Sequence, residues 1–217
     1  METSRESNGK NAATSAVREK VGKIYIFKIS SVLMLPMLLL LSFMTHAMHH
    51  LDNEKTTSVE KQKKLAEEMI DAFYSYNSSQ LAEHLKDAGP SAGRILYYQG
   101  WAEGGNYKVL ERFPCDVEQE NVIACGITVQ DDPVVALKTG FNVTDTFHIT
   151  FDGSKITQIK TSSNDQPVYY KARKWVEANL PEIMQGPCKN RNTQEGTPQD
   201  CARAMTAGYK QFYETVV

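Results

Sequence analysis

The chain has 217 residues, a formal net charge of -2 at pH 7 and 41% hydrophobic residues. This charge balance provides no electrostatic basis for binding nucleic acid, which requires a basic surface. The ordinary composition and the lack of internal repeats exclude fibrous and low-complexity proteins, and they predict a globular domain of the usual size.

An uncharged apolar stretch lies near the N-terminus. Residues 29–48 (ISSVLMLPMLLLLSFMTHAM) approach the roughly 20 residues that a helix needs to cross a bilayer. A basic tail over 1–28 precedes the stretch, and a linker over 49–57 with acidic residues follows it. The positive-inside rule therefore places the tail in the cytosol and the remaining chain in the secretory lumen or outside the cell.

Two fates for this stretch remain open. As an uncleaved signal anchor it makes the chain a single-pass membrane protein, with the membrane as its partner through 29–48. As a signal peptide it is cleaved after Ala47, where THA provides small residues, and the protein is secreted. The long region ahead of the apolar stretch favours the anchor, because signal peptides have short charged regions at this position.

Cysteines and glycosylation sequons support the same compartment. The chain has four cysteines, an even number. NSS at Asn77 and NVT at Asn142 are acceptor sequons for N-linked glycans. Together with the apolar stretch, these features predict a glycoprotein with disulfide bonds.

The chain after the linker begins with helical patterns. Apolar residues at helical spacing, starting with Leu65, predict a helix from near Ser58 with one buried face. A shorter helix carrying Leu81 and Leu85 is expected next. A third helix is expected over 91–103, since two glycines follow it.

Strand patterns follow on both sides of the turn EQEN. One antiparallel register places Cys115 opposite Cys125, within reach of a disulfide. The same register places Phe113 opposite Ile127. The alternating apolar residues agree with this register, so we expect a hairpin joined by a cross-strand disulfide.

Two more strands are expected over 141–151 and 155–163, joined by the turn DGS. A helix beginning near Pro167 follows. We expect a disulfide between Cys188 and Cys201 that holds a final helix, worth about 2–3 kcal/mol by the chain-entropy model. Counting alone leaves three pairings of four cysteines open. The elements describe an α+β fold with helices on one face of a curved antiparallel sheet.

This order, with FHITFDGSKITQIKT at 147–161 and ARKWVEANLPEIM at 172–184, resembles the nuclear transport factor 2-like superfamily. It is most similar to extracytoplasmic SnoaL-like proteins, relatives of polyketide cyclases and ketosteroid isomerases. The resemblance covers about 58–184 and leaves 185–217 as a disulfide-pinned helical extension. It implies a cone-shaped curved sheet, wrapped by the N-terminal helices, with a pocket in its open end.

The resemblance also implies positions for catalytic residues. Isomerases of this family use a first-helix tyrosine, a general-base aspartate after the second helix and a protonated aspartate on a late strand. Here Tyr74 or Tyr76 suits the first position and Asp87 the second, although Asp87 also suits a turn in KDAGP. The late-strand position falls on Phe147, which cannot donate a hydrogen bond, so the isomerase set is incomplete.

A ligand pocket in the cone draws on apolar and aromatic residues. The residues expected to line it are Phe73, Tyr74, Tyr98, Trp101, Phe147 and Ile149. Core packing is the alternative for the aromatic residues. His148 and Asp145 lie three residues apart on one strand, hence on opposite faces, and are not expected to form an acid–base pair. The run HAMHH does not complete a ligand set, so neither a metal site nor a cofactor is expected.

These observations favour a lumenal or extracellular domain that binds a small apolar ligand or a protein partner without catalysis. The alternative is an isomerase, cyclase or dehydratase acting on an apolar substrate in the cone pocket. A buried acid–base pair inside the pocket would favour the enzyme. A third reading is a structural module that forms a homodimer through the outer face of the sheet.

Overall fold

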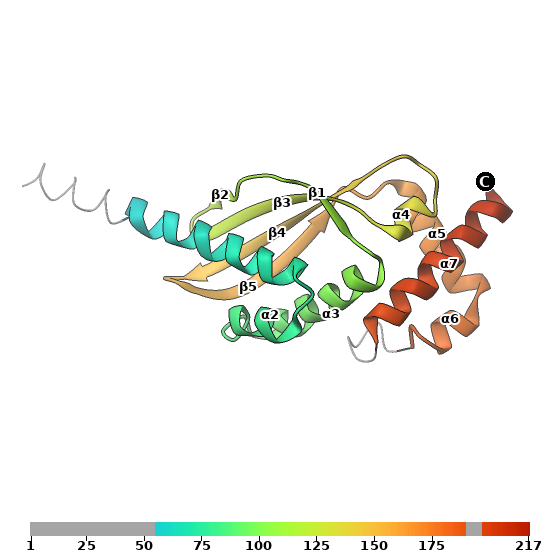
Figure 1. Ribbon diagram of the computed structural model, residues 1–217, viewed down its shortest axis with the longest axis horizontal. Helices are drawn as coiled ribbons and strands as arrows, with labels where there is room; N and C mark the ends of the chain where they lie inside the picture. Colours follow the sequence, from blue (N-terminus) through green and yellow to red (C-terminus); the bar gives the residue numbers. More distant parts are fainter. Residues whose placement is uncertain (1–54, 190–196) are drawn as a thin grey trace, which may run out of the picture. The chain divides into compact units, whose positions relative to one another are not determined.

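An antiparallel sheet with helices packed on it forms an α+β fold, which confirms the predicted class (Figure 1). The computed structural model describes residues 55–189 and 197–217, which belong to one compact unit. Among these residues no helix combines the length and the apolar character that crossing a bilayer requires. The predicted tail and apolar stretch at 1–48 lie outside the described residues.

The helices precede, interrupt and follow the sheet. In chain order they are the helix over 55–74, α2 (Ser78–His84), α3 (Pro90–Gly104), α4 (Asp132–Val135), α5 (Pro167–Asn179), α6 (Pro181–Gln185) and α7 (Pro198–Val216). The strands are β1 (Lys108–Arg112), β2 (Asp116–Gln119), β3 (Val122–Gln130), β4 (Val143–Asp152) and β5 (Lys155–Ser163). The first helix already includes 55–57, so its predicted start near Ser58 is wrong. The intervening residues contain no proline or glycine that would end a helix there.

The sheet has the order β1-β3-β4-β5, and β2 also pairs with β3. β1 and β2 therefore form one edge that is broken between them, where the sequence predicted one continuous strand. Pro114 lies in the break, and it has no N–H to donate to the ladder. The predicted pair Phe113–Ile127 is wrong by one residue: Arg112 lies opposite Ile127, and the Phe113 amide donates to the Gly126 carbonyl at 2.9 Å.

Two disulfides confirm the predicted pairings. Cys115 joins Cys125 across the sheet edge, with 4.3 Å between their Cα atoms. Cys188 joins Cys201 at the start of α7, with 4.7 Å between Cα atoms. All four cysteines are buried. Such bonds persist in oxidising compartments, which agrees with a lumenal or extracellular location.

The main core lies between one face of the sheet and the helices that cover it. β4 alternates strictly, so Asp145, Phe147 and Ile149 share the covered face. The 55–74 helix brings Met69 and Phe73 onto this face, and both are fully buried. Each such side chain contributes about 1.5–3 kcal/mol through burial. The core therefore fixes the position of the inner face of β4.

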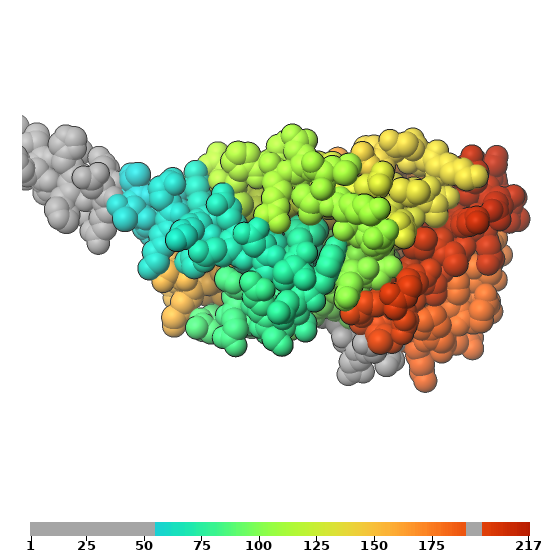
Figure 2. Space-filling view, in the orientation of Figure 1, coloured from blue at the N-terminus to red at the C-terminus, as the bar shows by residue number. Residues whose placement is uncertain are grey.

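A second apolar cluster joins the C-terminal helices to the end of α3. Its members are Leu137, Ala172, Val176, Ile183, Cys188, Cys201, Met205, Tyr209 and Phe212, with Trp101 packed against them. α7 approaches α3 closely because Gly104 has no side chain: a Cβ there would lie 2.3 Å from the Gln199 carbonyl oxygen. In the predicted extension over 185–217, the described helix α7 thus packs onto α3. In Figure 2 α7 (red) and the α5–α6 region (orange) form one end of the unit.

Three polar side chains contact one another on the outer face of the sheet. His148 lies on the face opposite Asp145, as the spacing predicts. Its Nδ1 lies 2.8 Å from the Glu118 carboxylate on β2, and its Nε2 lies 2.9 Å from the Ser162 hydroxyl on β5. These contacts connect three strands across an exposed surface.

We expect His148→Ala to lower the free energy of unfolding by about 1 kcal/mol, since partly exposed hydrogen bonds contribute modestly. Urea denaturation of both proteins measures this difference. A loss as large as that caused by truncating a core residue would contradict the surface role.

Candidate ligand pocket

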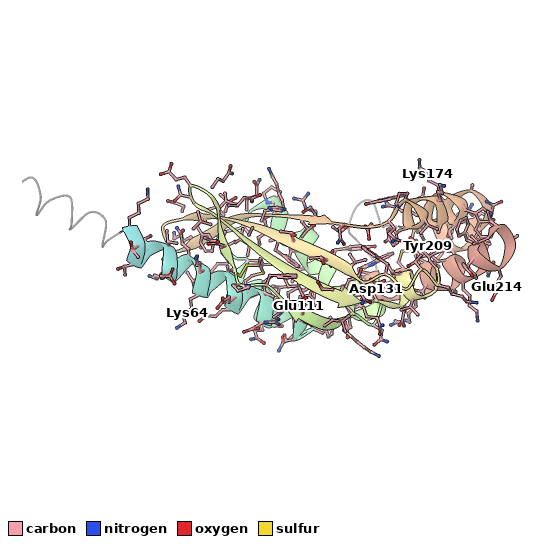
Figure 3. The ribbon with its side chains drawn as sticks, turned by 90° about the horizontal axis from the view of Figure 1, so that it is seen from above. Lys64, Glu111, Asp131, Lys174, Tyr209 and Glu214 are labelled. Atoms are coloured by element: carbon pink, nitrogen blue, oxygen red, sulfur yellow. A yellow bond between two sulfur atoms is a disulfide. The ribbon has the colours of Figure 1, made fainter. Side chains whose placement is uncertain are left out.

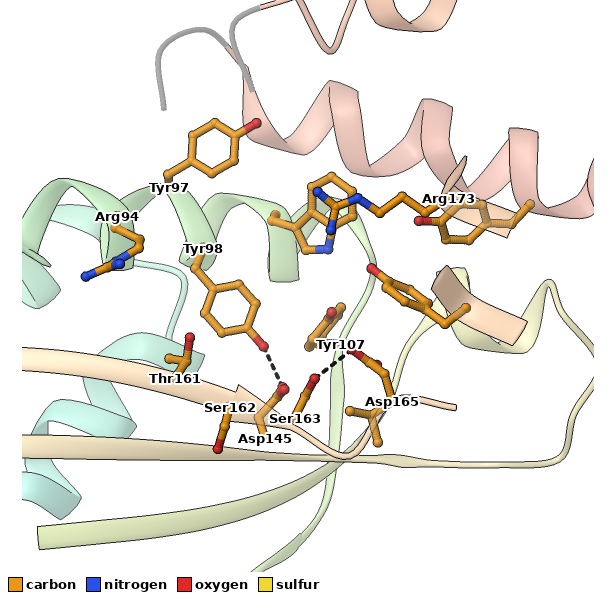
Figure 4. Close-up of a pocket in the computed structure, with 14 residues that line it drawn as sticks. Arg94, Tyr97, Tyr98, Tyr107, Asp145, Thr161, Ser162, Ser163, Asp165 and Arg173 are labelled. Carbon is orange, nitrogen blue, oxygen red and sulfur yellow. Dashed lines mark hydrogen bonds between the residues drawn. The ribbon is translucent and has the colours of Figure 1, made fainter. Parts of the chain in front are cut away.

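A pocket of about 320 Å³ opens where the sheet meets the C-terminal helices (Figure 4). Its walls come from α3, from the inner face of β4 and β5, and from α5 and α7. The aromatic lining residues are Tyr97, Tyr98, Trp101, Tyr107, Tyr169 and Tyr209. The charged ones are Arg94, Asp145, Asp165 and Arg173. The pocket thus combines aromatic walls with a few charged groups, which is typical of small-molecule sites.

A tyrosine and an aspartate form a hydrogen-bonded pair in this pocket. The alternation of β4 turns Asp145 inward, and α3 places Tyr98 opposite it. The Tyr98 hydroxyl donates to Oδ2 of Asp145 at 2.5 Å, and Figure 4 shows this contact. Asp145 is only 4% exposed. Among the described residues its other oxygen, Oδ1, accepts no hydrogen bond, so a ligand in the pocket can engage it.

The surroundings of Asp145 disfavour its negative charge. Burial raises the pKa of the Asp145 carboxyl to about 6, although the Tyr98 hydrogen bond opposes this shift. The nearby Asp165 carboxylate adds to the increase. Burial also raises the pKa of Tyr98 well above its ordinary value, so the hydroxyl keeps its proton at neutral pH. Asp145 therefore changes its charge near neutral pH, whereas Tyr98 remains a donor.

A second buried aspartate lies close to the pocket. Asp131 precedes α4 and accepts a hydrogen bond from the Val134 amide at 2.8 Å, which caps the helix. Burial raises the pKa of Asp131 to about 7, and the charges of Asp145 and Asp165 contribute to this increase. Figure 3 places Asp131 where the strands meet the C-terminal helices. The charges of Asp145 and Asp165 thus reach Asp131 at this end of the sheet.

The aromatic walls are held by ring contacts. The centroids of the Tyr98 and Tyr107 rings lie 6.4 Å apart, and those of Tyr169 and Tyr209 lie 5.4 Å apart. Burial raises the pKa values of Tyr107 and Tyr169 well above the ordinary value. Tyr107 and Tyr169 therefore stay uncharged at physiological pH.

Two arginines also line the pocket. Arg94 is exposed and extends away from Asp145 in Figure 4. Arg173 is half-buried, and its Nε donates to the Glu177 carboxylate at 3.2 Å. The pocket lining thus contains two arginine side chains as well as the carboxyl groups of Asp145 and Asp165.

The predicted lining residues divide between the pocket and the core. Tyr98 and Trp101 line the pocket. Phe73, Phe147 and Ile149 are fully buried in the core behind it.

The predicted catalytic candidates lie apart from the pocket lining. Tyr74 is half-buried, and its hydroxyl has no hydrogen-bond partner among the described residues. The Arg112 guanidinium lies 5.9 Å from the centroid of its ring. Asp87 is exposed between α2 and α3. The structure therefore leaves Asp87 apart from the Tyr98–Asp145 pair, whereas Tyr74 lies outside the pocket lining but near enough for the Asp145 charge to help raise its pKa.

Sequence reasoning missed Asp145 as a pocket residue. The resemblance places the late-strand acid at Phe147. Asp145 lies two residues earlier on β4 and therefore on the same face. This alternation is a signal that was present in the sequence. Tyr107, Tyr169 and Tyr209 gave no comparable signal, because they come from three separate parts of the chain.

The glycosylation candidates have exposed side chains. Asn77 precedes α2, and its Oδ1 accepts a hydrogen bond from the Gln80 amide at 3.1 Å. This bond does not use Nδ2, the atom to which an N-linked glycan would be attached. Asn142 directly precedes β4.

The arrangement can bind a ligand and can move a proton. The free oxygen of Asp145 can accept a hydrogen bond or bind a cation, and the pKa of this carboxyl suits proton transfer near neutral pH. Within 55–189 and 197–217, no group of three or more suitable side chains is placed to hold a metal ion.

Comparison with known proteins does not assign the pocket. No protein-family model, no curated protein and no solved structure matches the chain.

Proposed function

We propose that this domain binds a small organic molecule in the pocket between α3, the sheet and the C-terminal helices. The observation that carries this proposal is the Tyr98–Asp145 pair inside an aromatic pocket. Burying a carboxylate that receives a single hydrogen bond costs free energy, and such groups concentrate at binding and catalytic sites. The pocket volume of about 320 Å³ suits a small ligand.

We further propose that the domain works in the secretory lumen or outside the cell, either anchored through 29–48 or secreted after cleavage behind Ala47. The two disulfides support the compartment. Mass spectrometry of the purified protein distinguishes the two fates. A chain beginning at Met48 indicates secretion, and a full-length chain indicates an anchor.

The proposed fold type is the SnoaL-like cone of the nuclear transport factor 2-like superfamily. Support comes from the element order, in which three helices precede a curved antiparallel sheet. The inward-facing pocket at one end of the sheet agrees with the cone arrangement.

Fluorescence titration tests the binding function. The chain has two tryptophans, Trp101 in the pocket and Trp175 on α5. Trp175→Phe keeps a ring against Phe212 and leaves Trp101 as the single reporter. We expect a panel of small alicyclic and aromatic alcohols to include compounds that change Trp101 fluorescence in a saturable way.

Two further variants show whether the response comes from the pocket. Thr161 lines the pocket, so Thr161→Tyr fills it and should weaken binding at least tenfold. Thr146 lies on the outer face of β4, and Thr146→Tyr is the matched control that should leave binding unchanged. If no compound in the panel binds, or if both variants behave alike, the proposed function is wrong.

A second candidate function is proton-transfer catalysis with Asp145 as the base. The observation that favours it is the pKa of this carboxyl, about 6, beside the Tyr98 donor. A base in this position should accelerate exchange of the α-protons of a bound ketone with deuterium from the solvent. NMR with cyclohexanone as the probe measures this rate. If exchange is no faster than in buffer alone, Asp145 does not act as a base on this ketone. Ligand binding then remains the proposed function.

A further inference from the structure

We propose that the pocket selects organic cations, with an ammonium or quaternary ammonium group held against Oδ1 of Asp145 among the rings of Tyr98, Tyr107 and Trp101. The inference rests on the proposed ligand-binding function and names its ligand class. It joins three observations: the free carboxylate oxygen, the charges around it and the aromatic walls.

The first observation concerns charge. The neighbouring charge that acts on Asp145 is the Asp165 carboxylate. The charges that act on Asp131 are those of Asp145, Asp165 and Asp132. The two basic side chains that line the pocket, Arg94 and Arg173, are not among the groups that shift the pKa of either aspartate. A cation in the pocket would provide the missing counter-charge, whereas an anion would meet repulsion.

The second observation concerns the free oxygen. Asp145 is 4% exposed, and Tyr98 occupies only its Oδ2. A carboxylate has about four acceptor positions, so this buried side chain is under-satisfied. Asp145 is also one of the residues that line the cavity. The Asp145 side chain is therefore buried, lines the space that a ligand would fill and keeps one oxygen available to it.

The third observation concerns the walls. Six aromatic side chains line the pocket. Ring faces attract cations, and this attraction grows when water is excluded. Rings packed beside a carboxylate favour a quaternary ammonium group in particular, because such a group is bulky, apolar at its surface and positively charged.

The arginines do not remove this preference. Arg173 donates to the Glu177 carboxylate, and Arg94 is exposed at the edge. Neither is among the groups that shift the pKa of Asp145. They favour a ligand whose other end is neutral or negative and faces the outside.

Three probes of nearly the same shape test the inference. Choline carries a quaternary ammonium group, 3,3-dimethyl-1-butanol replaces its nitrogen with carbon, and 3,3-dimethylbutanoate carries a negative charge. Each is titrated at pH 7.5 into the Trp175→Phe protein, with Trp101 fluorescence as the readout. We expect the Kd of choline to be at least tenfold lower than that of the neutral alcohol, which corresponds to about 1.4 kcal/mol.

The variant Asp145→Asn separates charge from shape. Its amide oxygen can still accept from Tyr98, so the pocket should keep its form. We expect the preference for choline over the neutral alcohol to disappear. Glu111→Gln makes the same chemical change on the exposed strand β1 and should leave all three affinities unchanged.

Each outcome decides the question. Equal binding of choline and the alcohol overturns the cation preference but supports a ligand pocket. Tightest binding of 3,3-dimethylbutanoate overturns it and indicates recognition by Arg94 and Arg173. A choline preference that survives in Asp145→Asn overturns the role of this carboxylate. Failure of all three probes to bind overturns the inference, while the alcohol panel still tests the pocket separately.

Discussion

Asp145→Asn is expected to stabilise the folded protein at pH 8 by about 2–3 kcal/mol. An unfolded aspartate has a pKa near 3.8, and burial raises the pKa of Asp145 in the folded protein to about 6. Each unit of difference corresponds to about 1.36 kcal/mol, so the charged form carries a penalty of this size above pH 6. Asparagine has no charge to bury and can still accept from Tyr98.

The same difference sets a pH dependence with a definite sign. Between pH 3.8 and 6 the folded state holds the proton of Asp145 more tightly than the unfolded state does, so this group favours folding most at low pH. Its contribution is lost as the pH rises through about 6. Asp131, with a pKa raised to about 7, acts in the same direction. We therefore expect the free energy of unfolding to decrease between pH 5 and pH 8.

Urea denaturation at pH 5 and pH 8 measures both effects. The Asp145→Asn protein should gain stability at pH 8 and show a weaker pH dependence. Glu111→Gln is the control, because Glu111 lies on an exposed strand and does not line the pocket. Loss of stability in Asp145→Asn at pH 8 would show that the carboxylate supports the fold.

Phe147→Ala is expected to cost about 3–5 kcal/mol of stability, the usual loss for a buried phenylalanine. Phe147 is fully buried on the inner face of β4. Its ring centroid lies 5.0 Å from that of Phe73 and 6.1 Å from that of Tyr98. The truncation therefore leaves a cavity directly behind the pocket wall.

Phe113→Ala is the matched control in the same urea experiment. Phe113 is 45% exposed at the broken sheet edge, so we expect a loss of about 1 kcal/mol or less. Equal losses in the two variants would contradict the placement of Phe147 in the core. The comparison also separates a packing role for Phe147 from the ligand contact that the sequence predicted.

The sequence predicted the fold class and both disulfides because these depend on local patterns. Strict alternation in β4 determines which residues face inward, and the hairpin register brings Cys115 opposite Cys125. The break at Pro114 was missed because the pattern of apolar residues continues across it. That break shifts the pairing of Phe113 by one residue.

The pocket was predicted only in part. Tyr98 and Trp101 belong to one aromatic run on α3, so a local pattern indicated them. Tyr169 and Tyr209 reach the pocket only because α5 and α7 pack against the end of α3. Long-range packing of this kind leaves no periodic signal in a single sequence.

The high energetic cost of the Asp145 charge is consistent with a binding role. A residue that destabilises the fold at neutral pH is common at functional sites, where activity and stability compete. A bound cation would recover part of this cost, because it favours the charged carboxylate. Ligand binding and the charge of Asp145 are therefore coupled.

NMR titration of the Asp145 side-chain carboxyl carbon, with and without saturating choline, tests this coupling most directly. We predict a midpoint near pH 6 in the free protein, in agreement with its buried environment. Choline should lower that midpoint, since the cation stabilises the carboxylate. A midpoint near 4 that does not respond to choline would contradict both the buried charge and the cation site.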